Sequence, residues 1–153
     1  MNLYLSERHV FCDKKSIAEE FDKDRMEADM DLINELLNCL RNIDYNAFDE
    51  NYIDELLDSR DSAPFDTEWC RVEKEIEALK NDQNYTDETE KEQNKIREET
   101  FLIMEQNAGG ELSDYVSDDF GLIYDSFVLN YRDEWLEKLI GEYKNKRIPA
   151  GEL

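Results

Sequence analysis

Hydrophobic residues recur along most of this chain at intervals of three and four, which is the period of an amphipathic α-helix. The first such segment is predicted to begin near Ser16, because Ser16 and Glu19 form a capping-box pair, and to end near Arg41. Its second half carries the apolar positions Leu32, Ile33, Leu36, Leu37 and Leu40. Its first half is poorer in apolar residues, so a kink or break is compatible with the pattern there.

Five further segments are predicted helices, each with one apolar stripe. They run from 49 to about 60, from about 66 through 79, from about 87 to 108, from 113 or 117 to about 129, and from about 134 to 147. Ala63-Pro64 and Gly109-Gly110 mark ends between them. The chain has only 5 Gly and 2 Pro, which favours long helices over many tight turns. The sequence therefore predicts an all-α fold, a compact bundle of five or six helices.

The two ends of the chain are less regular. The short alternation of apolar and polar residues over 2–12 fits either a short β element or an extended lead-in. Residues 1–148 are expected to form a single acidic helical domain, and residues 149–153 to fray. The first residues lack the basic and apolar regions of a signal peptide, and no apolar run is long enough to span a membrane. A cytoplasmic location is the expectation.

Charge changes the picture more than any motif does. The 153 residues contain 40 Asp and Glu against 18 Lys and Arg, a formal charge of −22, and every third of the chain is net negative. Such a surface repels nucleic-acid phosphates and anionic lipid, so direct binding of nucleic acid or of a membrane surface is excluded. With 11% aromatic residues, the chain also differs from a disordered acidic tail.

The residues needed for most enzymatic chemistry are missing. His9 is the only histidine, and the glycines form neither a dinucleotide-binding nor a P-loop motif. Cys12, Cys39 and Cys70 contain no CxxC pair, and we expect Cys39 and Cys70 to pack as small hydrophobic residues. No cofactor is implied, and the prediction is a protein that is not an enzyme.

One enzymatic alternative remains open. Small helical nucleotide pyrophosphohydrolases hold Mg²⁺ with pairs of carboxylates spaced along helices. Glu55 and Asp58 have such a spacing and flank a pair of leucines, so they would be the ligands in that case.

The acids fall into rows at helical spacing. Neighbouring like charges on a helix are each mildly destabilising, by about 0.2–0.5 kcal/mol per pair. A row repeated at this cost suggests a purpose beyond a solvated exterior, although a solvated exterior stays the simpler reading. The candidate partner-binding residues combine one such stripe with nearby aromatic and acidic positions: Glu20, Asp24, Glu27, Asp31, Glu35, Tyr45, Asp49, Tyr52, Asp54 and Tyr85. Phe48 and Trp69 are expected instead to fill the space between the first and third helices.

These features favour a protein that binds and inhibits a basic protein partner. Rows of carboxylates can stand in for a phosphate backbone, as in inhibitors of nucleic-acid-handling machinery: immunity proteins for nuclease toxins, anti-CRISPR proteins and other DNA mimics. A helical scaffold or assembly module is the second alternative beside the pyrophosphohydrolase. The sequence does not determine the oligomeric state.

Overall fold

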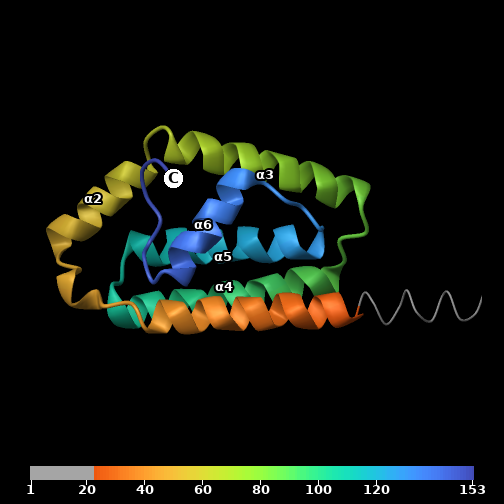
Figure 1. Ribbon diagram of the computed structural model, residues 1–153, viewed down its shortest axis with the longest axis horizontal. Coiled ribbons are helices and arrows are strands. Elements are labelled where there is room, and N and C mark those ends of the chain that lie inside the picture. The colour runs from red at the N-terminus through yellow and green to blue at the C-terminus, as the bar shows by residue number, and fades with distance from the viewer. Residues whose placement is uncertain (1–22) are drawn as a thin grey trace, which may run out of the picture. The chain divides into compact units, whose positions relative to one another are not determined.

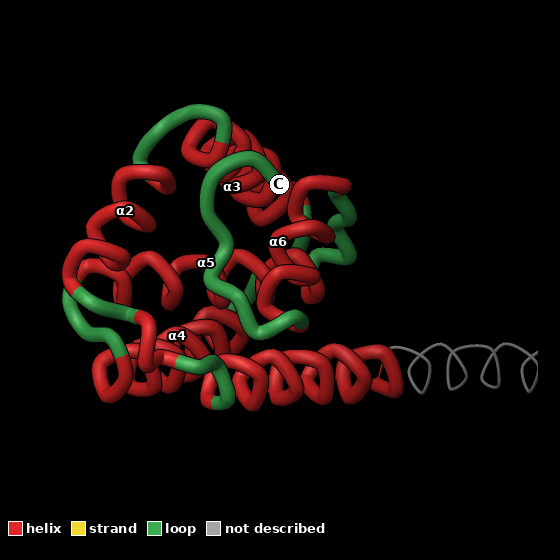
Figure 2. The backbone as a smooth tube through the Cα atoms, turned by 60° about the vertical axis from the view of Figure 1, so that its left-hand side comes forward, coloured by secondary structure: helices red, strands yellow, loops and turns green. Residues whose placement is uncertain are grey.

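A computed structural model describes residues 23–153, and over this range it contains six α-helices, one 3₁₀ turn and no strand (Figures 1 and 2). The predicted all-α fold is confirmed. The described residues fall into two units, with the boundary between Ile33 and Asn34. The predictions for residues 2–12, for a helix start near Ser16, and for His9, Cys12 and Glu20 lie outside the described residues.

The predicted helices are found with small changes in their ends. The N-terminal helix is unbroken over residues 23–41. After it come η1 (Tyr45–Ala47), α2 (Glu50–Arg60), α3 (Phe65–Asp82), α4 (Asp87–Asn107), α5 (Glu111–Val128) and α6 (Glu134–Lys144). Side-chain caps explain three of the starts, because Asp49, Thr86 and Asp133 each accept a hydrogen bond from a backbone N–H in the first turn of the helix that follows.

Helix α5 is the central element of the second unit. It runs alongside α4 (Figure 1) and also contacts α2 and α3. The sequence predicted one buried stripe on this helix, yet every residue from 119 to 126 is buried. Two carboxylates, Asp119 and Asp125, are therefore inside the protein and require partners there.

The end of the chain is anchored at Pro149. Residues 149–153 were expected to fray, but Ile148 and Pro149 are buried and the carbonyl oxygen of Pro149 accepts a hydrogen bond from Arg60 at 2.9 Å. The guanidinium of Arg60 thus connects the segment after α6 to the end of α2.

Two side chains on α3 differ from expectation. Trp69 fills space between α3 and α5, because its indole N–H donates to Asp119 at 2.9 Å. The prediction that Cys70 packs as a small hydrophobic residue is wrong: Cys70 is exposed, whereas Cys39 is half-buried. Because Cys70 follows Trp69 directly, it lies about 100° farther around α3, away from the face that packs inward.

Candidate functional site

The predicted acidic stripe lies on the N-terminal helix. Asp24, Glu27, Asp31 and Glu35 are all exposed there, while Glu20 lies outside the described residues. Successive members are three or four residues apart, so they share one face of the helix and present carboxylates to solvent.

The second predicted group surrounds the start of α2. Tyr45, Phe48 and Tyr52 stack edge to face, with ring centroids 4.9 Å apart in each pair. Tyr52 is 39% exposed, and Asp49 and Asp54 are also exposed. Tyr45 is more enclosed, since its hydroxyl donates to the carbonyl oxygen of Leu40 at 2.7 Å.

Tyr85 belongs to a separate cluster around the buried Asp125. Its hydroxyl donates to Asp125 at 2.6 Å, Gln93 donates to the same carboxylate at 2.6 Å, and Lys80 lies 2.8 Å from it. Lys80 also sits 4.6 Å from the centre of the Tyr85 ring. Burial raises the pKa of Asp125, and the hydrogen bonds from Lys80 and Tyr85 oppose that rise. The hydroxyl of Tyr85 therefore serves an internal contact.

The most enclosed polar cluster is centred on Asp119. Its carboxylate accepts hydrogen bonds from Arg60 at 2.7 and 3.0 Å, from the Trp69 indole at 2.9 Å and from the Tyr143 hydroxyl at 2.5 Å. The Arg60 guanidinium in turn stacks 4.5 Å from the centre of the Phe65 ring. Four donors satisfy the buried carboxylate, which is what burial of a charge requires.

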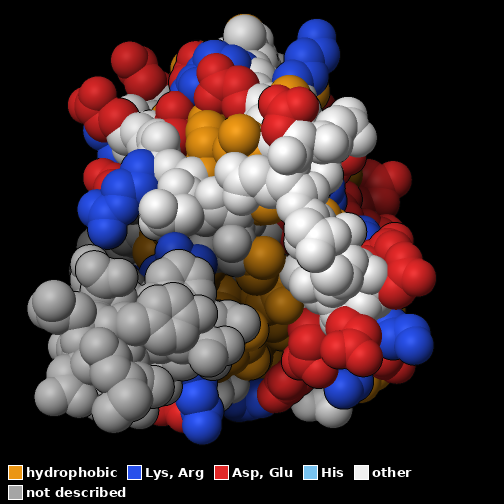
Figure 3. All heavy atoms as spheres, turned by 90° about the vertical axis from the view of Figure 1, so that its right-hand side faces the viewer, with side chains coloured by type: hydrophobic (Ala, Val, Ile, Leu, Met, Phe, Trp, Pro, Cys, Tyr) orange, Lys and Arg blue, Asp and Glu red, His pale blue; other side chains and the backbone are white. Residues whose placement is uncertain are grey.

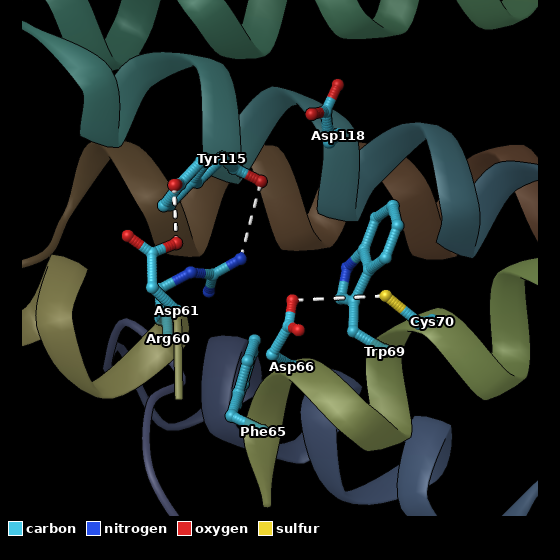
Figure 4. A pocket seen from close by; sticks show the side chains of 8 residues that line it. All are labelled: Arg60, Asp61, Phe65, Asp66, Trp69, Cys70, Tyr115 and Asp118. Carbon is cyan, nitrogen blue, oxygen red and sulfur yellow. Dashed lines mark hydrogen bonds between the residues drawn. The ribbon is translucent and has the colours of Figure 1, made fainter. Parts of the chain in front are cut away.

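A pocket of about 180 Å³ opens directly beside this cluster (Figure 4). We call it the α2–α3 pocket, and residues from the end of α2, the start of α3 and α5 line it: Arg60, Asp61, Phe65, Asp66, Trp69, Cys70, Tyr115 and Asp118. Figure 4 shows the Trp69 indole on one side, Tyr115 on the other, and the carboxylate of Asp66 at the start of α3. The carboxylate of Asp118 points away from Asp66 and pairs with Arg97 at 2.6 Å. Sequence reasoning missed this pocket, because its residues come from three segments that only the fold brings together.

The α2–α3 pocket has a negative electrostatic environment. The hydrogen bond to Asp61, followed by burial, raises the pKa of Tyr115 to about 12. Burial and then the carboxylate of Asp66 raise the pKa of Cys70. Burial also raises the pKa of Asp118, although Arg97 lies 2.6 Å away and opposes that rise. Loss of solvent is the larger cause at Cys70 and Asp118, so the negative sign of the pocket follows from its lining, which has three acids and one cation.

The outer surface has the same sign. On the face in Figure 3, Asp and Glu side chains lie at many separate places with Lys and Arg between them. Many of the cations are paired with acids of the same chain, as Arg41 is with Glu99 and Arg147 with Glu142. Even complete pairing of all 18 cations would leave the formal charge of −22 on unpaired acids.

Two absences apply to the described part of the chain. Among residues 23–153, no group of three or more His, Cys, Asp or Glu is arranged to hold a metal ion, and Glu55 and Asp58 are exposed on α2. Within the same range, no helix is both long and apolar enough to cross a membrane.

Comparison with known proteins gives one result. No curated protein and no solved structure shows significant similarity to the chain. The model of one protein family, Immunity protein PIM1, matches residues 32–150, a range that includes η1, all of α2 to α6 and every residue of the α2–α3 pocket. The chain belongs to the PIM1 family of immunity proteins.

Proposed function

We propose that this immunity protein neutralises its toxin by binding a basic surface of that toxin, without catalysing a reaction. Family membership supports an immunity role and hence a partner. The observation that supports a basic partner is the excess of acids over cations. The formal charge is −22, and many of the cations of the chain already form internal salt bridges. A toxin that acts on nucleic acid presents such a basic surface, so a nuclease toxin is the partner we favour.

The acidic stripe and the start of α2 are the proposed contact residues. Asp24, Glu27, Asp31 and Glu35 supply exposed charge, and the exposed ring of Tyr52 supplies apolar contact area beside Asp49 and Asp54. Tyrosine and arginine residues contribute most of the binding energy at many protein interfaces. An exposed tyrosine beside carboxylates can therefore contact an arginine of the partner.

Long-range attraction between an acidic inhibitor and a basic toxin accelerates association, and dissolved salt screens it. The test is to measure association with the toxin that this protein neutralises at about 0.05 M and about 0.5 M NaCl. The association rate constant is expected to fall at least about tenfold, with a much smaller change in the dissociation rate. An association rate that is insensitive to salt would overturn the electrostatic proposal.

Stoichiometry tests the absence of catalysis. If inhibition is by binding alone, toxin activity falls in proportion to added protein and reaches its minimum at a fixed molar ratio. Loss of toxin activity at amounts of protein far below that of the toxin would indicate turnover and contradict the proposal.

A further inference from the structure

The size of the α2–α3 pocket limits what can occupy it. At about 180 Å³ it is smaller than the ~300–1,000 Å³ of sites that enclose small-molecule ligands. A cavity of this size accommodates one protruding side chain of a protein partner. Small, well-defined pockets of this kind hold the anchor residues of protein interfaces.

Internal hydrogen bonds hold the walls of the pocket in place. Asp119 binds both Arg60 and the Trp69 indole, and the Tyr115 hydroxyl donates to Asp61 at 2.5 Å. Arg60 is fixed further by its stacking on Phe65. Because these side chains are already ordered, a ligand entering the pocket would lose little free energy to ordering them.

The charges at the pocket favour a cation. In the part of the chain that the structure describes, no Lys or Arg forms a salt bridge with Asp61 or Asp66. The positive charge of Arg60 is balanced by Asp119 behind the wall, at 2.7 Å. The hydrogen bond to Asp61, the largest cause of the raised pKa of Tyr115, agrees with this sign.

The arrangement of the lining favours arginine over lysine. The carboxylate of Asp66 and the flat indole of Trp69 both extend from α3, and the carboxylate of Asp61 lies at the end of α2 (Figure 4). A guanidinium is planar, stacks on aromatic rings and carries five N–H donors directed to several sides, whereas an ammonium is compact and more strongly hydrated. An arginine can therefore stack on Trp69 while it donates to Asp66 and Asp61.

The geometry points to the α2–α3 pocket as the seat of one arginine side chain of the toxin, held by Asp61, Asp66 and the Trp69 ring. This inference rests on the proposed function, because it assigns a specific contact to the basic partner.

The first experiment uses the protein alone, with Nα-acetyl-arginine amide as the probe. The chain has two tryptophans, and their indole N–H signals in an NMR spectrum report on two places: Trp69 in the pocket and the buried Trp135 outside it. The Trp69 signal is expected to shift saturably with the probe while the Trp135 signal stays in place. The lysine analogue should shift it less, and the neutral citrulline analogue should leave it unchanged. No shift with the arginine probe, or equal shifts with citrulline, would overturn the inference.

A matched pair of variants separates the pocket from the general charge. Asp66→Asn and Asp82→Asn each remove one negative charge from exposed positions at opposite ends of α3. Asp66→Asn is expected to abolish the probe-induced shift and to raise the Kd for the toxin at least about thirtyfold, mainly through faster dissociation. Asp82→Asn should change the Kd less than about twofold. Thermal unfolding of both variants checks that each is folded.

The outcomes distinguish this inference from the proposed function. Toxin affinity that depends on salt but is equal in the two variants would overturn the arginine pocket and leave the basic partner in place. A saturable shift of the Trp69 signal together with salt-insensitive toxin binding would support the pocket and contradict the general electrostatic proposal.

Discussion

Asp119 in the middle of α5 holds Arg60 at the end of α2 with two hydrogen bonds of 2.7 and 3.0 Å, and neither side chain is more than 4% exposed. The two residues are 59 positions apart in the sequence. Their contact connects α2 to the central helix and, through Pro149, to the last segment of the chain. Arg60 lines the α2–α3 pocket and Asp119 holds it from behind, so the stability of the fold and the shape of the candidate site depend on one interaction.

We expect Arg60→Ala to lower the free energy of unfolding by about 3–5 kcal/mol, because it leaves the buried carboxylate of Asp119 without its cation. Denaturant unfolding followed by circular dichroism measures this loss. Arg41→Ala is the control, since Arg41 and Glu99 form an exposed ion pair whose loss should cost less than about 1 kcal/mol. If both variants lose the same free energy of unfolding, the buried pair contributes no more to stability than the exposed one.

We expect any larger residue at Gly121 to destabilise the fold, because the side chain of Arg97 crosses directly over this position. A Cβ added at Gly121 would lie 2.8 Å from Cδ of Arg97, whose guanidinium pairs with Asp118 at 2.6 Å. Gly121→Ala is therefore expected to destabilise the wild-type protein by about 1–3 kcal/mol. In an Arg97→Ala background the same change should stabilise by about 0.5–1 kcal/mol, because alanine is the better helix former. A double-mutant cycle measures the difference, and the same effect in both backgrounds would refute the steric explanation.

The pH dependence of stability should contain a contribution from Asp133. Burial raises the pKa of this group, but hydrogen bonds from Arg71 and from the backbone N–H of Leu136 outweigh burial and hold the pKa below its ordinary value of 3.8. A lowered folded-state pKa stabilises the protein above the ordinary value, and this stabilisation disappears as the pH falls through the lowered one.

Asp133→Asn tests this contribution, because asparagine also caps helices well and preserves the start of α6. The variant should be less stable than the wild type by about 1 kcal/mol at neutral pH, a value reduced because Arg71 is partly exposed. The gap should close as the pH falls below 3.8. A gap that stays constant from neutral to acidic pH would show that the charge of Asp133 contributes nothing to stability.

Reversing the acidic stripe should weaken toxin binding without unfolding the protein. Replacing Asp24, Glu27 and Asp31 by lysine changes three exposed charges. We expect a fall of at least about tenfold in the association rate constant at low salt. The matched control reverses three exposed acids elsewhere, Asp82, Glu98 and Glu105. If both triple variants bind equally well, the stripe is not the interface and only the net charge matters.

Local sequence signals located the helices accurately because capping and periodicity act within a few residues. Helix starts were predicted at 49 and at about 134, and the side chains of Asp49 and Asp133 cap the helices that begin there. The start of α5 was predicted at 113 or 117, two or six residues late, because the helix begins at Glu111, directly after Gly110 and without a side-chain cap. The apolar stripe of α5 was also predicted, but the burial of the polar residues on the same helix was not.

The candidate site was less predictable, because its contacts join residues that are far apart in the sequence. Tyr85 was singled out as a contact residue because it stands alone among polar neighbours, yet its hydroxyl is bonded to Asp125, 40 positions away. The exposed stripe from Asp24 to Glu35 needed only helical spacing to be recognised. The α2–α3 pocket needed three helices in place before its residues could meet.

By itself the sequence determined the all-α fold, the approximate helix boundaries and the acidic surface, because these follow from local periodicity, capping and net charge. Only the tertiary structure decided which acids are buried and which face solvent. That choice depends on packing: α5 is enclosed by α2, α3 and α4, so Asp119 and Asp125 became internal anchors, while Asp61 and Asp66 stayed open to a partner. The side chains of Asp119 and Asp125 lie 2.7 and 2.8 Å from Arg60 and Lys80. Only the fold creates these contacts, so the sequence pattern alone does not distinguish these two aspartates from the exposed ones.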